Sequence, residues 1–145
     1  MTTKNEVRPI YWDASAVLSV LFEDRHSVHA QDWAKREGYH LLSTLSYTET
    51  CAVMARMRRD YLLADILIEA AFEALHQGPW RRLHMGPQWG TVYSLAMKWP
   101  LRGADLWHLA VAKSLQEKLP GLVLLSFDDK LNLAAQNEGL GSQQP

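Results

Sequence analysis

The most constraining feature of this 145-residue chain is an uninterrupted apolar run near its carboxyl end. Residues 122–127 read LVLLSF, follow a Pro-Gly turn and precede two aspartates, Asp128 and Asp129. A strand that is apolar on both sides is typical of a parallel sheet with both faces covered. Parallel strands need long crossover connections, which are usually helices. The run therefore predicts an α/β fold.

The rest of the sequence alternates strand and helix patterns, as such a fold requires. Three more short strands are predicted, at residues 8–13, 39–44 and 80–85. Helical periodicity predicts helices at residues 15–25, 26–38, 46–60, 61–78, 87–99, 103–119 and 129–139. Residues 1–145 are thus expected to form a single three-layer sandwich, with a mainly parallel central sheet flanked by helices and a frayed polar tail from about residue 140.

Composition excludes several classes of protein. Fifteen basic and sixteen acidic residues nearly cancel, so no overall charge advertises a nucleic-acid or membrane partner. The single cysteine, Cys51, excludes an internal disulfide and a thiolate metal cluster, which favours a reducing, cytoplasmic location. No apolar run approaches the roughly 18 residues of a membrane span. No membrane partner is expected.

Acidic residues follow the predicted strands. Asp13 and Asp128 end two of them, Asp105 opens the helix near residue 103, and Glu49 lies one turn into the helix after the second strand. Each aspartate has a simpler explanation, because Asp before a helix is a preferred N-cap, and a lone Glu49 would be a solvated helix residue. Caps, however, have no reason to gather at strand ends that converge on one ligand-binding crevice.

Four segments carry a family resemblance. YWDASAVLSVLF, YTETCAVM, LRGADLWHLAVA and LSFDDKLNLAA resemble, in order, the acidic motifs of PIN-domain nucleases, most closely the VapC-type toxins of bacterial toxin–antitoxin pairs. The resemblance implies a PIN-like fold. It also assigns the catalytic and metal-binding acids, Asp13, Glu49, Asp105 and Asp128, and the small hydroxyl residues that accompany the first and fourth of them, Ser15 and Ser126.

Two departures from the family pattern are visible. Trp107 stands where the family usually carries a small residue, which would narrow or reshape the substrate cleft. Little sequence remains after Gly139 for a final strand, which leaves the edge of the sheet undefined.

Chemistry explains why such a site uses carboxylates. Four of them close together repel one another and take up protons unless cations neutralise them. Mg²⁺ or Mn²⁺ prefers oxygen ligands and makes a coordinated water more acidic, which suits phosphodiester hydrolysis. The resemblance implies that the substrate is RNA and that cleavage leaves a 5′-phosphate and a 3′-hydroxyl.

Adjacent acids at a strand-to-helix junction point in different directions, so both are not expected to bind the ion. Asp128 is nearer the strand end and matches the family position. Asp129 suits the first turn of the following helix, where it would interact with the helix dipole.

RNA binding needs positive charge and stacking surfaces near the acids. The group that precedes Asp105 is the best candidate and consists of Lys98, Trp99 and Arg102. Among the histidines, His108 is expected to pack in the core or beside the acids. His26 and His29 are expected on a solvated helix face rather than at a zinc site, because no third ligand is near.

Three functions remain open. The favoured one is a metal-dependent ribonuclease toxin that forms a homodimer and is restrained by an antitoxin segment lying across the cleft. The second is a PIN-like nuclease of RNA processing without an antitoxin. The third is a non-catalytic α/β interaction module whose acids are helix caps.

Overall fold

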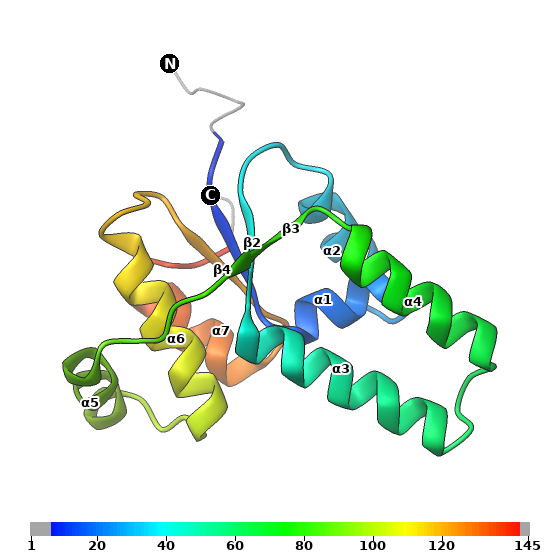
Figure 1. Cartoon of the computed structure of the whole chain (residues 1–145). Helices are drawn as coiled ribbons and strands as arrows, with labels where there is room; N and C mark the ends of the chain where they lie inside the picture. Colours follow the sequence, from blue (N-terminus) through cyan, green and yellow to red (C-terminus); the bar gives the residue numbers. More distant parts are fainter. Residues whose placement is uncertain (1–6, 143–145) are drawn as a thin grey trace.

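The computed structural model describes residues 7–142, in which one sheet of parallel strands has the order β3-β2-β1-β4 (Figure 1). The strands are β1 (Ile10–Trp12), β2 (His40–Ser43), β3 (Trp80–Leu83) and β4 (Val123–Leu125). The helices are α1 (Ala14–Leu21), α2 (Ser27–Ala34), α3 (Thr44–Arg59), α4 (Asp65–Gln77), α5 (Trp89–Lys98), α6 (Gly103–Gln116) and α7 (Asp129–Asn137). This confirms the predicted α/β sandwich. None of the helices in the described part combines the length and apolarity needed to cross a membrane.

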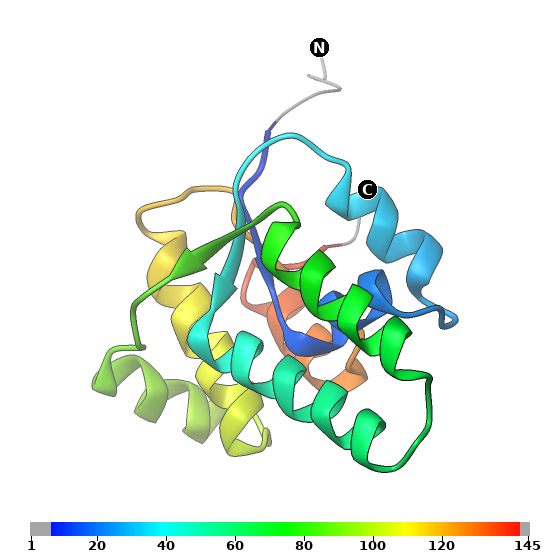
Figure 2. The same cartoon turned by 45° about the vertical axis from the view of Figure 1, so that its right-hand side comes forward.

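Alternation along β1 divides the core between the two faces of the sheet. Tyr11 packs in one cluster with residues of α5, α6 and α7, whereas Trp12 packs in another with residues of α1, α2, α3 and α4. Figure 1 and Figure 2 show these two groups of helices on opposite sides of the strands. Successive side chains of a strand point to opposite faces, so three buried residues of β1 contribute to both layers.

Every predicted strand and helix is present, but most are shorter than predicted. The first helix ends at Leu21 instead of residue 25, because Asp24 accepts a hydrogen bond from the backbone N–H of His26 at 2.8 Å and turns the chain. The fourth helix begins at Asp65 instead of residue 61. Tyr61 has a φ of 54°, a left-handed conformation that a right-handed helix excludes.

Leu140, where the polar tail was predicted to begin, is part of the core. Leu140 is fully buried, and its carbonyl accepts a hydrogen bond from the N–H of Leu124 at 2.8 Å. The prediction of a frayed tail from residue 140 was therefore wrong at this position, because burial of an apolar side chain stabilises the folded state. Residues 143–145 lie outside the described part. Leu140 also gives a partner to the outer edge of β4 without forming a fifth strand there.

Candidate active site

The carboxyl ends of the strands lie at one edge of the sheet, where α1, α3, α6 and α7 also begin (Figure 1). Asp13 and Asp128 immediately precede α1 and α7, Asp105 lies in the first turn of α6, and Glu49 lies in the second turn of α3. The charges of the other three all act on Asp105. The structure thus brings together the four acids selected from the sequence.

Asp13 is a buried acid held by three hydrogen bonds. Its Oδ1 accepts from the hydroxyl of Ser15 at 2.7 Å and from the N–H of Ala16 at 2.9 Å, and its Oδ2 accepts from the hydroxyl of Ser126 at 2.5 Å. Burial raises the pKa of Asp13 above its usual range, although these donors favour the charged form. The two serines therefore fix the orientation of the first acid, which gives a physical role to the hydroxyl residues of the motifs.

Asp105 is half-buried and surrounded by like charges. Burial is the largest cause of its raised pKa, followed by the charges of Asp128 and Asp13. Among the described residues, no lysine or arginine forms an ion pair with any of these three aspartates. The charge of His108 lowers the pKa of Asp105 but does not outweigh burial and the neighbouring carboxylates.

Asp128 combines both roles considered for it. Its side chain accepts a hydrogen bond from the N–H of Leu131 at 3.0 Å, so it is the N-cap of α7. It is exposed, and it is near enough to Asp105 to raise the pKa of that acid. Asp129 is the first residue of α7, as predicted for an interaction with the helix dipole.

Glu49 reaches the site through a buried histidine. Its Oε1 lies 2.6 Å from Nε2 of His108, and Nδ1 of His108 lies 2.6 Å from the hydroxyl of Tyr11. His108 is only 1% exposed, whereas the side chain of Glu49 is 34% exposed. The expectation that His108 packs beside the acids is therefore met.

The PIN domain family matches residues 10–137, which include all four acids. The chain belongs to the PIN-domain family. PIN domains are nucleases that generally use divalent metal ions. No curated protein matches the chain in sequence.

Solved structures share this PIN fold. PAE2754 from Pyrobaculum aerophilum is 19% identical, with a TM-score of 0.58 over 90% of this chain and 87% of that one. VapC20 from Mycobacterium tuberculosis, a toxin that cleaves the sarcin-ricin loop, is 16% identical, with a TM-score of 0.59 over 94% of this chain and 99% of that one. At these identities the likeness concerns the fold alone.

The acid cluster of this PIN domain fits a hydrated divalent ion. Within residues 7–142, no three His, Cys, Asp or Glu side chains already enclose a metal position. Mg²⁺ does not require such a cage, since it keeps several waters and usually takes one or two protein carboxylates. The pKa of Asp105 is raised first by burial and then by the neighbouring carboxylates, and a bound cation would favour its charged form. Asp13, Asp105, Asp128 and Glu49 supply the hard oxygen donors that such an ion prefers.

The three residues predicted to contact RNA differ in their contacts within the protein. Lys98 and Trp99 both contact Glu138, with Nζ of Lys98 at 2.6 Å and Nε1 of Trp99 donating at 2.9 Å. Arg102 is exposed and is the N-cap residue of α6, three positions before Asp105. Unlike that of Lys98, the side chain of Arg102 forms no ion pair among the described residues.

Trp107, which departs from the family pattern, packs against the core. It is partly buried against the core cluster of Tyr11, and its ring meets that of His108 edge-on at 5.8 Å. The large side chain therefore supports His108 from one side.

An aromatic cluster beside the fourth acid was missed by sequence reasoning. The ring of His26 stacks on Phe127 at 4.5 Å and that of His29 meets it edge-on at 5.8 Å. Phe127 directly precedes Asp128. The spacing of two histidines one helical turn apart was visible, but their partner is distant in sequence.

Proposed function

We propose that this PIN domain is a Mg²⁺- or Mn²⁺-dependent endoribonuclease that hydrolyses RNA phosphodiester bonds and acts in the cytoplasm as the toxin of a toxin–antitoxin pair. The observation that carries the proposal is the position of Asp105 among other carboxylates. Burial and the charges of Asp128 and Asp13 raise its pKa, and no lysine or arginine of the described residues forms an ion pair with these acids. A bound divalent cation would relieve this repulsion.

The acidic side chains would bind the metal ion, and Arg102 would bind the RNA. Asp13 is a rigid ligand because three donors fix it, while Asp105, Asp128 and Glu49 are accessible from the open edge of the sheet. When bound, the ion increases the acidity of a coordinated water and neutralises charge on the phosphate. Arg102 is available to hold a neighbouring phosphate of the RNA.

Metal titration and RNA cleavage test the proposal together. The metal-stripped protein is expected to bind Mn²⁺ in a calorimetric titration and to cleave RNA only when Mn²⁺ or Mg²⁺ is present, leaving 5′-phosphate ends. A folded protein that neither binds Mn²⁺ nor cleaves RNA in its presence would contradict the proposal.

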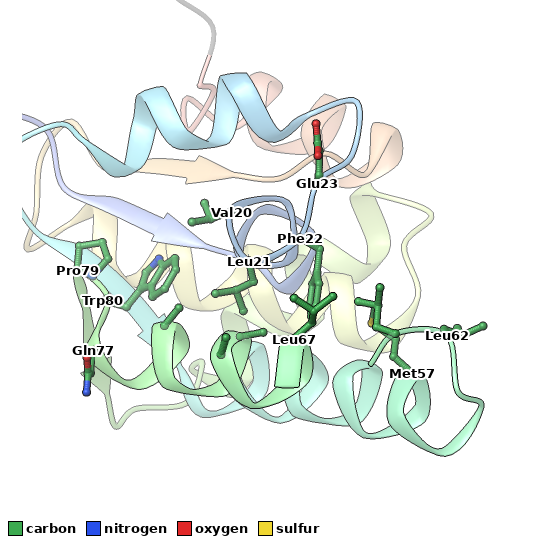
Figure 3. Close-up of a pocket in the computed structure, with 15 residues that line it drawn as sticks. Val20, Leu21, Phe22, Glu23, Met57, Leu62, Leu67, Gln77, Pro79 and Trp80 are labelled. Atoms are coloured by element: carbon green, nitrogen blue, oxygen red, sulfur yellow. The ribbon is translucent and has the colours of Figure 1, made fainter. Parts of the chain in front are cut away.

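An apolar groove supports an antitoxin partner. It has a volume of about 910 Å³ and lies between α1, the end of α3, α4 and the start of β3. Figure 3 shows Pro79 and Trp80 at one end, Met57 and Leu62 at the other, and Leu67 between them. Since the lining is mostly apolar, we propose that an apolar helix of the antitoxin covers this groove. An adjoining basic segment of the antitoxin would then reach the acids.

A second surface supports a homodimer. Trp89, Tyr93 and Met97 are 93%, 69% and 70% exposed and form one stripe along α5. Residues four positions apart lie on the same face of a helix. We propose that two copies of the chain pack through this stripe, and that Tyr93→Glu yields a monomer in sedimentation experiments.

One observation favours the interaction module as a second candidate. Asp13 and Asp128 both cap helices, so their positions have a structural explanation. Metal titration separates the two candidates, because caps alone do not create Mn²⁺ affinity. Growth of the native host separates a toxin from a processing nuclease: expression alone should slow growth, and an upstream antitoxin should restore it.

A further inference from the structure

A buried chain of hydrogen bonds leads from the core to one of the acids. The hydroxyl of Tyr11 lies 2.8 Å from Oγ of Ser43 and 2.6 Å from Nδ1 of His108, and Nε2 of His108 lies 2.6 Å from Oε1 of Glu49. The chain joins β1, β2, α6 and α3, four elements that meet at the open edge of the sheet. Only its last member, Glu49, reaches solvent.

The chain is anchored at its inner end. Oγ of Ser43 accepts a hydrogen bond from the N–H of Ser46 at 3.1 Å, and the hydroxyl of Ser46 donates to the carbonyl of Trp12 at 2.7 Å. The hydroxyl of Tyr11 donates to Ser43, and that of Ser43 donates to Ser46 at 3.2 Å. Nδ1 of His108 contacts the Tyr11 hydroxyl, and because a carboxylate only accepts, the Nε2–H group donates to Glu49. Both ring nitrogens of His108 therefore have a polar partner.

The orientation of the Glu49 carboxylate is fixed by fewer hydrogen bonds than that of Asp13. Asp13 has three donors and Asp128 caps a helix, whereas within residues 7–142 the one hydrogen-bond partner of the Glu49 carboxylate is His108. A glutamate has three side-chain torsions, and ordering such a side chain costs conformational entropy. A single fixed donor at 2.6 Å therefore selects one orientation among many.

We propose that His108, held by Tyr11, is a positioning residue that orients the carboxylate of Glu49 for divalent-ion binding, an inference that rests on the proposed function. Partners that hydrogen-bond to metal-binding side chains fix their orientation, and their loss typically weakens metal affinity about 10–100-fold. His108 does not touch the ion. It acts by presenting Glu49 to the other three acids.

The other face of the sheet supplies a matched control. Trp12 Nε1 donates to Nδ1 of His40 at 3.0 Å, and Nε2 of His40 contacts the carbonyl of Arg36 at 2.7 Å. This is also a buried histidine bonded to an aromatic residue of β1, but its second nitrogen meets the backbone instead of an acid. A purely structural role for His108 would make the two pairs equivalent.

Two substitutions separate the two nitrogens of His108. The amide of Asn reaches the place of Nδ1, so His108→Asn keeps a partner for Tyr11 and loses the donor to Glu49. The amide of Gln reaches the place of Nε2, so His108→Gln keeps that donor. Binding of Mn²⁺ to the full-length, metal-stripped protein is measured by the electron paramagnetic resonance of free Mn²⁺. We expect about 10–100-fold weaker binding for His108→Asn and recovery of most of this loss in His108→Gln.

Tyr11→Phe keeps the test decisive if the histidine variants do not fold. It removes one hydroxyl from the chain without changing the ring, and is expected to weaken Mn²⁺ binding by about 10-fold, the lower end of the range. Trp12→Phe, which removes the donor to His40, should lower the melting temperature and leave Mn²⁺ affinity unchanged.

The outcomes distinguish this inference from the proposed function. Wild-type protein that binds no Mn²⁺ contradicts both. Wild-type protein that binds Mn²⁺ and cleaves RNA, together with Tyr11→Phe and His108→Asn variants of unchanged Mn²⁺ affinity, overturns the positioning role and leaves the nuclease intact. Equal loss in the Asn and Gln variants also overturns it, because the effect would then follow the loss of the imidazole rather than the loss of the donor to Glu49.

Discussion

The two faces of the sheet bury similar polar pairs, each consisting of a histidine and an aromatic residue of β1. On the face covered by α5, α6 and α7, Tyr11 contacts His108, whose other nitrogen meets the carboxylate of Glu49. On the face covered by α1 to α4, Trp12 contacts His40, whose other nitrogen meets a backbone carbonyl. One pair ends at the acid cluster, and the other ends within the fold.

The difference lies in what the second nitrogen touches. A buried imidazole needs partners for both nitrogens, and a backbone carbonyl satisfies this need without further consequence. A carboxylate at an open edge is held in place by the same bond. The face of Trp12 also carries the apolar groove, so we expect changes there to alter partner binding, and changes around Tyr11 and the acids to alter metal binding and catalysis.

The largest effect is expected at Asp105. Asp105→Asn should reduce RNA cleavage by more than about 100-fold, the upper end for residues that act only through a metal-binding side chain. The fold should be intact or more stable, because one charge leaves a repulsive cluster. Initial cleavage rates and thermal melting measure the two effects. Asp65→Asn is the matched control, since Asp65 is also an aspartate in the first turn of a helix but lies far from the site, and it should cleave normally.

The pH dependence of stability tests whether charge repulsion at Asp105 destabilises the metal-free protein. The pKa of Asp105 is raised in the folded state above its ordinary value of 3.8. The folded protein then holds a proton that the unfolded chain has lost, so this contribution is fully present below the unfolded pKa and is lost as the pH rises through the folded pKa. Metal-free wild-type protein should therefore lose more stability than Asp105→Asn as the pH rises above about 4. Parallel pH profiles for the two proteins would count against charge repulsion.

The next effect tests whether the groove is separate from catalysis. Leu67→Asp should weaken antitoxin binding by about 30-fold or more, which corresponds to roughly 2 kcal/mol for a central interface residue. Leu67 lines the groove and is 53% exposed, so the substitution leaves the core intact. Titration with the purified antitoxin measures the affinity, and RNA cleavage should be unchanged. Ile66→Asp is the control, because Ile66 is 72% exposed but does not line the groove. Equal losses in both variants would exclude the groove as the binding site.

A smaller effect concerns an ion pair on the face of Tyr11. Glu138 accepts from Lys98, Trp99 and Lys113, and these partners hold its pKa below its usual range despite burial. Glu138→Gln should lower the free energy of unfolding by about 1–3 kcal/mol, the cost of leaving buried polar groups poorly paired. Because the pKa is lowered, this stabilisation is present above the unfolded pKa and disappears as the pH falls through the folded one.

Chemical denaturation at pH 7 and at pH 3 measures the contribution of Glu138. The difference between wild type and Glu138→Gln should shrink at the lower pH. Glu117→Gln is the control, since Glu117 is exposed and forms no ion pair among the described residues, so its effect should stay within about 0.5 kcal/mol. If Glu138→Gln is equally harmless, Lys98 is not held in place by Glu138 and is available for RNA.

Local patterns predicted most of the fold and the location of the acids. Apolar periodicity is a property of neighbouring residues, so each strand and helix was recognised. In a parallel sheet the carboxyl ends of all strands share one edge, so Asp13 and Asp128 were expected to approach each other. Boundaries were less accurate because single contacts set them, such as the hydrogen bond from the N–H of His26 to the carboxylate of Asp24.

Long-range contacts explain what the sequence did not predict. The bond between His108 and Glu49 joins residues 59 positions apart, and that between Trp99 and Glu138 joins residues 39 apart. No periodicity specifies which polar side chains meet across two helices. The groove likewise depends on how α1, α4 and β3 pack together, so its apolar residues could not be distinguished from core residues in the sequence.

The smallest expected change in stability is that of Asp129→Asn, and a comparison with Asp128→Asn separates helix capping from metal binding at the end of β4. Asn is as good an N-cap as Asp, so Asp128→Asn should keep the hydrogen bond to the N–H of Leu131 and preserve stability while it weakens Mn²⁺ binding and cleavage. Asp129→Asn should leave both activities unchanged and cost about 0.3–1 kcal/mol through the helix dipole. Urea denaturation and Mn²⁺-dependent cleavage of the same RNA measure these effects. If Asp129→Asn is the inactive variant, the fourth acid is Asp129, and Asp128 is a helix cap like any other.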